Sequence, residues 1–192
     1  DIRASFLLAG AMLGRFGKAV MPMPGGCSIG LRPVDLHLKG FTSLGAECNI
    51  EQGMVNIEAK ELKGNEVYLD FPSVGATENI MLAGVLAKGE TTISNCAIEP
   101  EIVDLAKFLN SIGAKISGAG TDTIVIKGVN ELGGCCHRVI PDRIEAGTFM
   151  IAVAGAGGNV KIQDVIPEQL RPVISKLKEA DVEVKEDENS VT

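Results

Sequence analysis

Residues 76–88 read ATENIMLAGVLAK, and the architecture of the chain follows from this stretch because it occurs in three versions. Its counterparts are residues 4–16 and 146–157, which repeat at an offset of about 70 residues. Each run is long enough for a helix and carries little charge on any face, and such a helix belongs in the interior of a protein. A glycine closes each run, at Gly17, Gly89 and Gly158.

The same three units continue with a short strand and an amphipathic helix. The strands are predicted at residues 19–21, 91–94 and 160–162. The second amphipathic helix has the clearest pattern, because Glu99 and Pro100 suit a helix start and apolar residues then recur at helical spacing up to Ile112. Its counterparts are predicted at residues 34–44 and 168–179.

A glycine turn and a hairpin complete the unit. Gly45-Ala46 and Gly113-Ala114 end the first two amphipathic helices. Hairpins are predicted at residues 47–57 and 115–126, and residues 182–184 begin a third. The third unit reads Lys178-Glu179-Ala180-Asp181 where Gly-Ala is expected, so either the turn is tighter there or residues are missing. The unit is thus helix, strand, helix and hairpin, an α/β module with a mixed sheet on one side.

Composition excludes several classes of protein. The 192 residues suffice for one good core or two modest ones, and a net charge of −7 argues against a nucleic-acid partner. No apolar run has the length of a membrane span, so no membrane partner is expected. The five cysteines and two histidines fit no metal spacing, and free thiols in a reducing cytosol are expected. Because the chain starts without Met and stops in a predicted strand, we expect it to be a piece of a longer protein.

Residues 24–37, PGGCSIGLRPVDLH, form the most informative loop. Its glycines free the backbone for an irregular conformation, and Arg32 follows Cys27 five positions later. A nearby guanidinium favours the thiolate and also matches phosphate or carboxylate oxygens. From the residues alone, Cys27 is either a reactive thiol or a small buried apolar residue.

This loop, cysteine included, resembles the catalytic loop of the UDP-N-acetylglucosamine 1-carboxyvinyltransferases, a branch of the enolpyruvyl transferase family. The resemblance implies an inside-out α/β barrel of repeated βαβαββ modules with buried helices, incomplete in this chain. It places residues 1–140 as two modules of the catalytic-loop domain and residues 141–192 as the first, partial module of a second domain. Residues 140–143 resemble the crossover strand between the domains.

The resemblance also implies a reaction: transfer of the enolpyruvyl group of phosphoenolpyruvate to the 3′-hydroxyl of UDP-N-acetylglucosamine, in bacterial cytoplasmic peptidoglycan synthesis. Cys27 would be the acid and could hold a covalent adduct, while Arg32 and Arg3 would contact anionic groups. No cofactor and no metal are implied. Alternatively, Arg32 caps the following helix and Arg3 is a solvated charge.

Further site residues are implied by the same resemblance. Arg32, Pro33, Val34, Asp35 and Leu36 match a uridine-binding segment, and Phe71, Pro72, Ser73 and Val74, with Gly75, match a diphosphate-contacting loop at a helix start. Some family members have a lysine where this chain has Phe71. Glu99 and Glu101 resemble acidic residues facing the cleft, and Asp142-Arg143 a charged pair at the hinge; His37 is either a ligand contact or structural. The plain alternatives are an N-cap at Ser73 or Thr77, helix-terminal charges, and a surface salt bridge.

Two other functions remain open from the sequence. One is the related transferase that makes 5-enolpyruvylshikimate-3-phosphate, and the other is a non-catalytic repeat or scaffold protein, or an RNA-end-processing relative. The family's Lys-Asn pair and its general base would lie outside residues 1–192, in the remainder of the same polypeptide. We therefore expect the 192-residue chain by itself to be inactive.

Overall fold

The computed structural model describes residues 3–24 and 34–192, and the chain divides into two compact units, Asp1–His137 (unit 1) and Arg138–Thr192 (unit 2). The described part of unit 1 contains, in chain order, η1 (Arg3–Leu7), α1 (Leu8–Phe16), β1 (Lys18–Pro22), α2 (Asp35–Ser43), β2 (Glu47–Glu51), β3 (Met54–Glu58), β4 (Glu66–Tyr68), α3 (Val74–Gly84), β5 (Glu90–Ser94), α4 (Pro100–Ser111), β6 (Lys115–Ser117) and β7 (Thr123–Lys127). The described part of unit 2 contains α5 (Arg143–Ala156), β8 (Ile162–Gln163), α6 (Pro167–Glu179) and β9 (Ser190–Val191).

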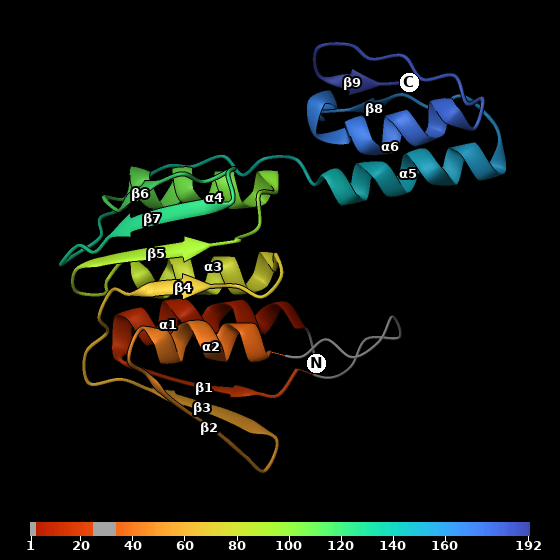
Figure 1. Cartoon of the computed structure of the whole chain (residues 1–192). Helices are drawn as coiled ribbons and strands as arrows, with labels where there is room; N and C mark the ends of the chain where they lie inside the picture. The colour runs from red at the N-terminus through yellow and green to blue at the C-terminus, as the bar shows by residue number, and fades with distance from the viewer. Residues whose placement is uncertain (1–2, 25–33) are drawn as a thin grey trace. The chain divides into compact units, whose positions relative to one another are not determined.

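Two sheets carry the strands of unit 1 (Figure 1). The first has the order β1-β3-β2 and is antiparallel, and the second has the order β4-β5-β7-β6, with only the β4–β5 pair parallel. Alternate residues point into the core, as Val55 and Ile57 do on β3 and Ile124 and Ile126 on β7, all fully buried. Both predicted hairpins are confirmed, and neither sheet closes into a barrel among the residues described.

Helix α3 is the centre of unit 1, as its sequence predicts. It contacts α1, α2, α4 and strands β5 and β7. Small residues on its neighbours allow this close packing: a Cβ on Gly10 of α1 would lie 2.2 Å from the carbonyl oxygen of Asn79, and a Cβ on Gly40 of α2 would lie 2.3 Å from Cγ1 of Ile80. These two glycines therefore allow α1 and α2 to pack directly against α3.

The structure corrects the predicted end of this helix. It ends at Gly84 and not at Lys88, because the residues after Gly84 pair with another part of the chain. The Lys88 amide donates to the Leu62 carbonyl and the Gly64 amide donates to the Lys88 carbonyl, so backbone pairing competes successfully with further helix. Strand β4 pairs in parallel with β5 and was not predicted. Its three residues contain only one apolar side chain that points inward, that of Val67, which is too short a pattern to indicate a strand. With β4, residues 66–127 form a complete βαβαββ module.

Unit 2 has a small core of its own, formed by one face of α5, by α6 and by β9. Helix α5 buries only Ala146, Gly147 and Met150, so the prediction of a helix buried on all sides is wrong for this chain. Of the strand predicted at residues 160–162 only Ile162 is in a strand, the two-residue β8, and residues 182–184 form no strand. Instead the chain reverses at Asp187–Ser190, where the Lys185 and Thr192 backbones pair.

The three amphipathic helices end in the same way. Gly45 after α2 and Gly113 after α4 have positive φ, which confirms the predicted glycine caps. After α6 the same position is occupied by Asp181, whose φ is 60°. Neither a tighter turn nor missing residues are needed to explain the absent glycine, because an aspartate adopts its conformation.

Candidate active site

One edge of unit 1 gathers most of the predicted site residues that the structure describes. Figure 1 shows that β1, β4 and β5 point toward the same edge, and that α2, α3 and α4 begin there. The described residues of the connecting segments at this edge are 23–24, 34, 69–73 and 95–99. Amide groups in the first turn of a helix have no partner within the helix and favour anionic ligands. The first turn of α3 carries no acidic residue, whereas that of α2 carries Asp35 and that of α4 carries Glu101.

Ser73 organises the start of α3. Its hydroxyl accepts a long hydrogen bond from the Ala76 amide at 3.4 Å, while its carbonyl accepts from the Thr77 hydroxyl at 2.8 Å. The Thr77 hydroxyl in turn accepts from the Ala97 amide at 3.1 Å, which ties the segment after β5 to the one after β4. Next to this capped start, Phe71 and Pro72 are exposed.

The segment at the start of α2 is anchored to the same edge. Val34 is buried, Asp35 is exposed in the first turn, and Leu36 packs against the core. One turn further on, Lys39 forms an ion pair with Asp70 at 2.9 Å, between Nζ and Oδ2. This contact links α2 to the segment that leads into Phe71.

His37 lies inside this part of the molecule. It is 6% exposed, its ring meets that of Phe6 edge-on at a centroid distance of 5.2 Å, and its Nδ1 lies 2.8 Å from Nδ2 of Asn79. On the other side, the ring edge abuts Gly75. The structure therefore brings His37 next to one residue of the Phe71–Gly75 stretch.

Three carboxylates surround the start of α4. Glu99 occupies the N-cap position, and its buried Oε2 atom has no hydrogen-bond partner among the described residues. Glu101 lies in the first turn of α4. Glu78 on α3 faces this group: burial, and secondarily the negative charge of Glu101, raise its pKa to about 7. Near neutral pH Glu78 is therefore about as often protonated as ionised.

Glu78 and Asn79 are absent from the residues that the sequence suggests for the site. The available signal was the run Thr77-Glu78-Asn79 at the beginning of an otherwise apolar helix. Because Thr77 and Asn79 are fully buried, their side chains require hydrogen-bond partners inside the protein. Polar residues in a helix that is predicted to be interior therefore indicate buried hydrogen bonds between that helix and its neighbours.

Several predicted residues lie outside the residues described. These are Cys27, Arg32 and Pro33, and for Arg3 the description covers only its backbone in η1. The other four cysteines are described: Cys135 and Cys136 are exposed, whereas burial raises the pKa of the thiols of Cys48 and Cys96. Within residues 3–24 and 34–192, no group of three or more potential ligands could hold a metal ion, and no helix could cross a membrane.

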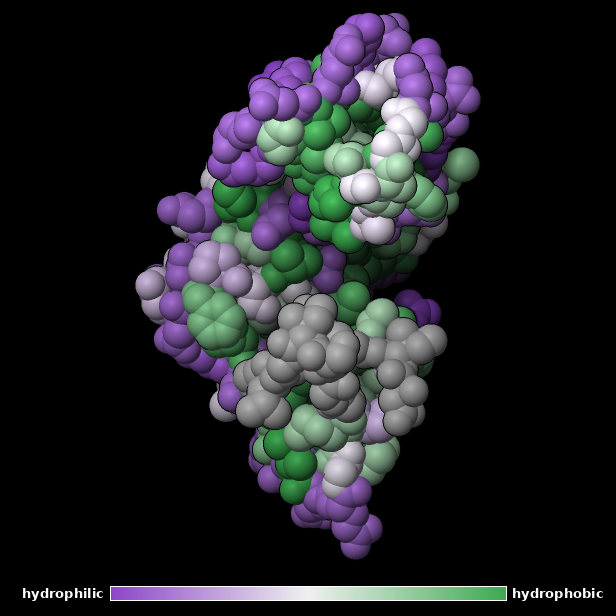
Figure 2. Space-filling model, turned by 90° about the vertical axis from the view of Figure 1, so that its right-hand side faces the viewer, coloured by the Kyte–Doolittle hydropathy of each residue, from purple (hydrophilic) through white to green (hydrophobic). Residues whose placement is uncertain are grey.

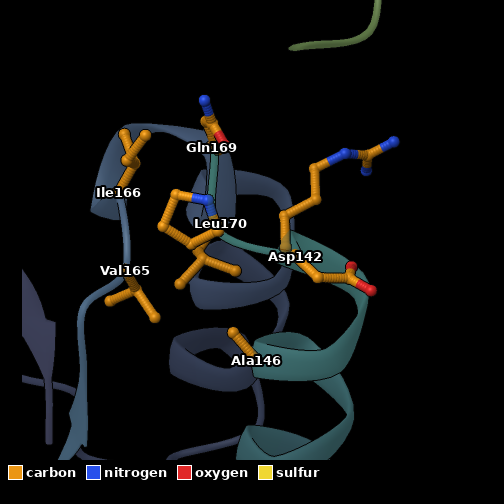
Figure 3. Close-up of a pocket in the computed structure, with 8 residues that line it drawn as sticks. Asp142, Ala146, Val165, Ile166, Gln169 and Leu170 are labelled. Carbon is orange, nitrogen blue, oxygen red and sulfur yellow. The ribbon is translucent and has the colours of Figure 1, made fainter. Parts of the chain in front are cut away.

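Asp142 and Arg143 belong to unit 2. The Asp142 carboxylate caps α5, because its Oδ1 accepts from the amides of Ile144 at 2.8 Å and Glu145 at 3.2 Å. Figure 3 shows a depression between this helix start, residues 165–166 and the first turn of α6. This depression is too shallow to enclose a nucleotide sugar, since ligand pockets are usually clefts or cavities that bury most of the ligand.

Apolar side chains are exposed at the edge of unit 1. Figure 2 faces this edge and shows green hydrophobic groups among the purple hydrophilic surface. Among the residues of the connecting segments that the structure describes, Met23, Phe71 and Ile98 are large, apolar and exposed. Phe71 is 58% exposed, so an aromatic face is available there.

Comparisons with known proteins agree over the whole chain. The model of the family described as EPSP synthase (3-phosphoshikimate 1-carboxyvinyltransferase) matches residues 1–192. UDP-N-acetylglucosamine 1-carboxyvinyltransferase 1 of Caldanaerobacter subterraneus is 60% identical over 190 residues, covering 99% of this chain and 46% of that protein. UDP-N-acetylglucosamine 1-carboxyvinyltransferase 2 of Carboxydothermus hydrogenoformans is 60% identical over 188 residues, covering 98% and 45%. The chain thus spans about half the length of the curated relatives it matches.

Solved structures give the same answer for the fold. The enolpyruvyl transferase NikO from Streptomyces tendae matches with a TM-score of 0.77 at 25% identity, over 100% of this chain and 47% of that one. An EPSP synthase from Acinetobacter baumannii matches with a TM-score of 0.65 at 26% identity, over 98% and 44%. These likenesses confirm the predicted fold class of βαβαββ modules in an incomplete enolpyruvyl transferase-like chain.

Proposed function

Because the chain belongs to the EPSP synthase family, we propose that the complete protein transfers the enolpyruvyl group of phosphoenolpyruvate to the 3′-hydroxyl of UDP-N-acetylglucosamine. This reaction would be the first committed step of peptidoglycan synthesis in a bacterial cytoplasm. The single observation that carries the choice of substrate is the 55–60% identity to relatives named for UDP-N-acetylglucosamine, against 26% to the EPSP synthase structure.

The proposed reaction is an addition followed by an elimination. A proton adds to C3 of the enol while the sugar oxygen bonds to C2, and a base takes the hydroxyl proton. The tetrahedral intermediate then loses a proton from C3 and the C2–O bond to phosphate breaks, which restores the double bond and releases phosphate. The chemistry requires an acid near C3 and positive groups around phosphate and carboxylate.

In this proposal the thiol of Cys27 supplies the acid and can also hold phosphoenolpyruvate as a thioether adduct. Arg32 contacts the phosphoenolpyruvate anion, and Arg3 another anionic group. No cofactor is needed. The base is assigned to the remainder of the polypeptide, so that the 192-residue chain by itself would release no phosphate.

The UDP-sugar would bind along the edge of unit 1. Arg32, Pro33, Val34, Asp35 and Leu36 would hold the uridine, with Phe71, Pro72, Ser73 and Val74 at the diphosphate. Three features support this assignment: the start of α3 capped by Ser73, the Lys39–Asp70 ion pair between the two segments, and the contact of His37 with Gly75. Glu99 and Glu101 are proposed to face the cleft, and Asp142 and Arg143 to lie at the hinge.

The test is a site-resolved mass measurement on the complete protein. Incubation with phosphoenolpyruvate, or with an electrophilic epoxide such as fosfomycin, should add mass to the peptide containing Cys27. Cys135→Ser and Cys136→Ser remove the exposed thiols that would otherwise react with any electrophile. If the mass appears on Cys48 or Cys96 and not on Cys27, the assignment of the acid is wrong.

A binding measurement separates the proposal from its nearest rival. UDP-N-acetylglucosamine should bind to the complete protein in isothermal titration calorimetry, and shikimate-3-phosphate should not. The reverse result would identify a 5-enolpyruvylshikimate-3-phosphate synthase. Binding of neither compound, together with an unreactive Cys27, would favour a non-catalytic role.

A further inference from the structure

The chain between β7 and the end of unit 1, residues 128–137, forms neither helix nor strand, and we call it the strap. Backbone pairing holds its first part. The Val129 amide donates to the Val85 carbonyl at 2.9 Å, and the Gly133 amide donates to the Ile112 carbonyl at 2.7 Å, where α4 ends. From there the strap runs back beside α4 toward the start of that helix (Figure 1).

Beyond these two hydrogen bonds, the strap contacts α4 through side chains. The Ser111 hydroxyl donates a hydrogen bond to Sγ of Cys135 at 3.0 Å. The His137 ring lies beside that of Phe108, with a centroid distance of 5.5 Å, and its Nε2 lies 3.1 Å from Oδ1 of Asp104. The contacted positions of α4 are three and four residues apart, so they share one side of the helix.

The strap has little slack between its contacts. From Gly133 to His137 the chain advances four residues, which span at most about 14 Å. The residues that hold these two ends, Ile112 and Asp104, are eight positions apart, or about 12 Å along a helix axis. The strap is therefore nearly extended here, and alternate side chains of an extended chain point the same way. Cys135 and His137 accordingly both contact α4.

His137 is the covered end of the strap. Its side chain is 19% exposed and that of Asp104 is 13% exposed, whereas residues 133–136 and 138–139 are exposed. A carboxylate that is covered to this extent requires a hydrogen-bond partner, and the imidazole supplies one, with Nε2–H donating to the carboxylate oxygen. The pair thus joins a covered acid on α4 to the last residue of unit 1.

We propose that the pair of His137 and Asp104 is a latch, which holds the strap on α4 and makes Arg138 the first residue at which the chain can bend between the two units. Unit 1 ends at His137. On the other side the Asp142 carboxylate caps α5, and residues 138–141, between these two contacts, are in no helix or strand. Bending is thereby confined to four residues. This inference concerns the joint between the units and does not depend on which ligand the protein binds.

Hydrogen–deuterium exchange of the complete protein, resolved to single amides, tests the latch. In wild type the Gly133 amide should exchange slowly, and the amides of residues 138–140 should exchange fast. His137→Ala should speed exchange at Gly133 about tenfold or more, as the loss of a hydrogen bond to a charged group does. The Val129 amide should be unaffected, because its partner lies before the part of the strap that the latch holds.

Two substitutions of His137 separate the hydrogen bond from ring packing. His137→Gln keeps an N–H donor near the position of Nε2 and should restore slow exchange at Gly133, whereas His137→Phe keeps a ring beside Phe108 and should not. Asp104→Leu should release the strap as His137→Ala does, and combining the two should add nothing further, because both break the same contact. Arg138→Ala, at the next and exposed residue, is the matched control and should leave Gly133 unchanged.

Four results would overturn the latch. The first is a wild-type Gly133 amide that exchanges as fast as residues 138–140, and the second is unchanged exchange at Gly133 in His137→Ala. The third is an equal rise at the buried amide of Gly10, since that would show a general loss of stability. The fourth is exchange in His137→Gln as fast as in His137→Phe. None of these results involves the transfer reaction, so the proposed function stands or falls separately.

Discussion

Asp181 adopts the left-handed backbone conformation that Gly113 adopts one repeat earlier, with φ of 60° and 109° respectively. The hydrogen bonds around the two residues are also the same. The amide after Asp181, on Val182, donates to the Leu177 carbonyl at 3.0 Å, and the amide after Gly113, on Ala114, donates to the Leu109 carbonyl at 3.0 Å. The third repeat thus retains the turn of the second without its glycine.

The first prediction follows from the cost of this conformation. Asp181→Gly should raise the free energy of unfolding of unit 2 by about 1 kcal/mol, because a side chain disfavours positive φ and glycine does not. Denaturant titration followed by circular dichroism measures the change. Asp181→Ala is the matched control and should destabilise, since alanine lacks the short polar group that helps aspartate in this region. A destabilised Asp181→Gly variant would contradict the argument.

Much of the fold could be predicted from sequence because each repeat is marked by patterns of residues that are close together in the chain. The caps Gly45 and Gly113 and the apolar spacing of α4 are properties of neighbouring residues, and the predicted elements are found there. Strand β4 and the early end of α3 could not be predicted in this way. Both depend on pairing between residues distant in sequence, such as the Lys88 amide with the Leu62 carbonyl.

The candidate site was less accessible to sequence reasoning. The resemblance pointed to reactive or charged residues in loops and at helix starts. It gave no reason to select Asn79 or Glu78, which lie within an apolar helix. Their surroundings explain their importance: Asn79 finds partners on η1, α1 and α2, and Glu78 faces Glu101 of α4. Such partners become visible only when the helices are packed together.

The second prediction concerns pH and Glu78. Burial, and then the charge of Glu101, raise the pKa of Glu78 from 4.5 to about 7. The folded state therefore binds this proton more tightly than the unfolded state, so the contribution of Glu78 to stability is fully present below pH 4.5 and is lost as pH rises through 7. Glu78→Gln should abolish that loss and stabilise unit 1 at pH 8 by on the order of 1–2 kcal/mol, after allowance for solvent screening.

Denaturation at pH 5 and pH 8, followed by the fluorescence of Tyr68, measures this effect in unit 1, because Tyr68 is the chain's one tyrosine. Glu101→Gln should reproduce part of the effect, since it removes the neighbouring negative charge. Glu47→Gln, on the exposed β2, is the control and should leave the pH dependence unchanged. An equal stability gain at both pH values would mean that Glu78 is not the group responsible.

The third prediction compares two glycines in helices of similar composition. Gly10→Ala should destabilise unit 1 by roughly 3 kcal/mol or more, because the new methyl would meet the backbone oxygen of Asn79 and α1 must move away from α3. Gly155→Ala on α5 meets nothing within 4 Å and should stabilise unit 2 by up to about 1 kcal/mol through helix propensity. Thermal unfolding of both variants decides, and a tolerated Gly10→Ala would refute the close helix contact.

The fourth prediction concerns the exposed apolar side chains of α5. Ile144, Phe149 and Ile151 are 60%, 56% and 58% exposed in this chain, although the repeat pattern marks α5 as an interior helix. We propose that the remainder of the polypeptide covers these side chains, as the chain spans less than half of its relatives. The 192-residue chain should then bind a hydrophobic dye that the complete protein does not bind.

Phe149→Ser tests this covering directly, because the same substitution should have different effects in the two contexts. In the 192-residue chain it should change stability by no more than about 0.5 kcal/mol, as an exposed substitution does. In the complete protein it should cost about 3–5 kcal/mol, as the loss of a buried aromatic side chain does. Glu188→Ser, in the exposed turn before β9, should have little effect in either context. Equally small effects of Phe149→Ser in both would mean that the Phe149 side chain stays in solvent, and the proposed covering would be wrong.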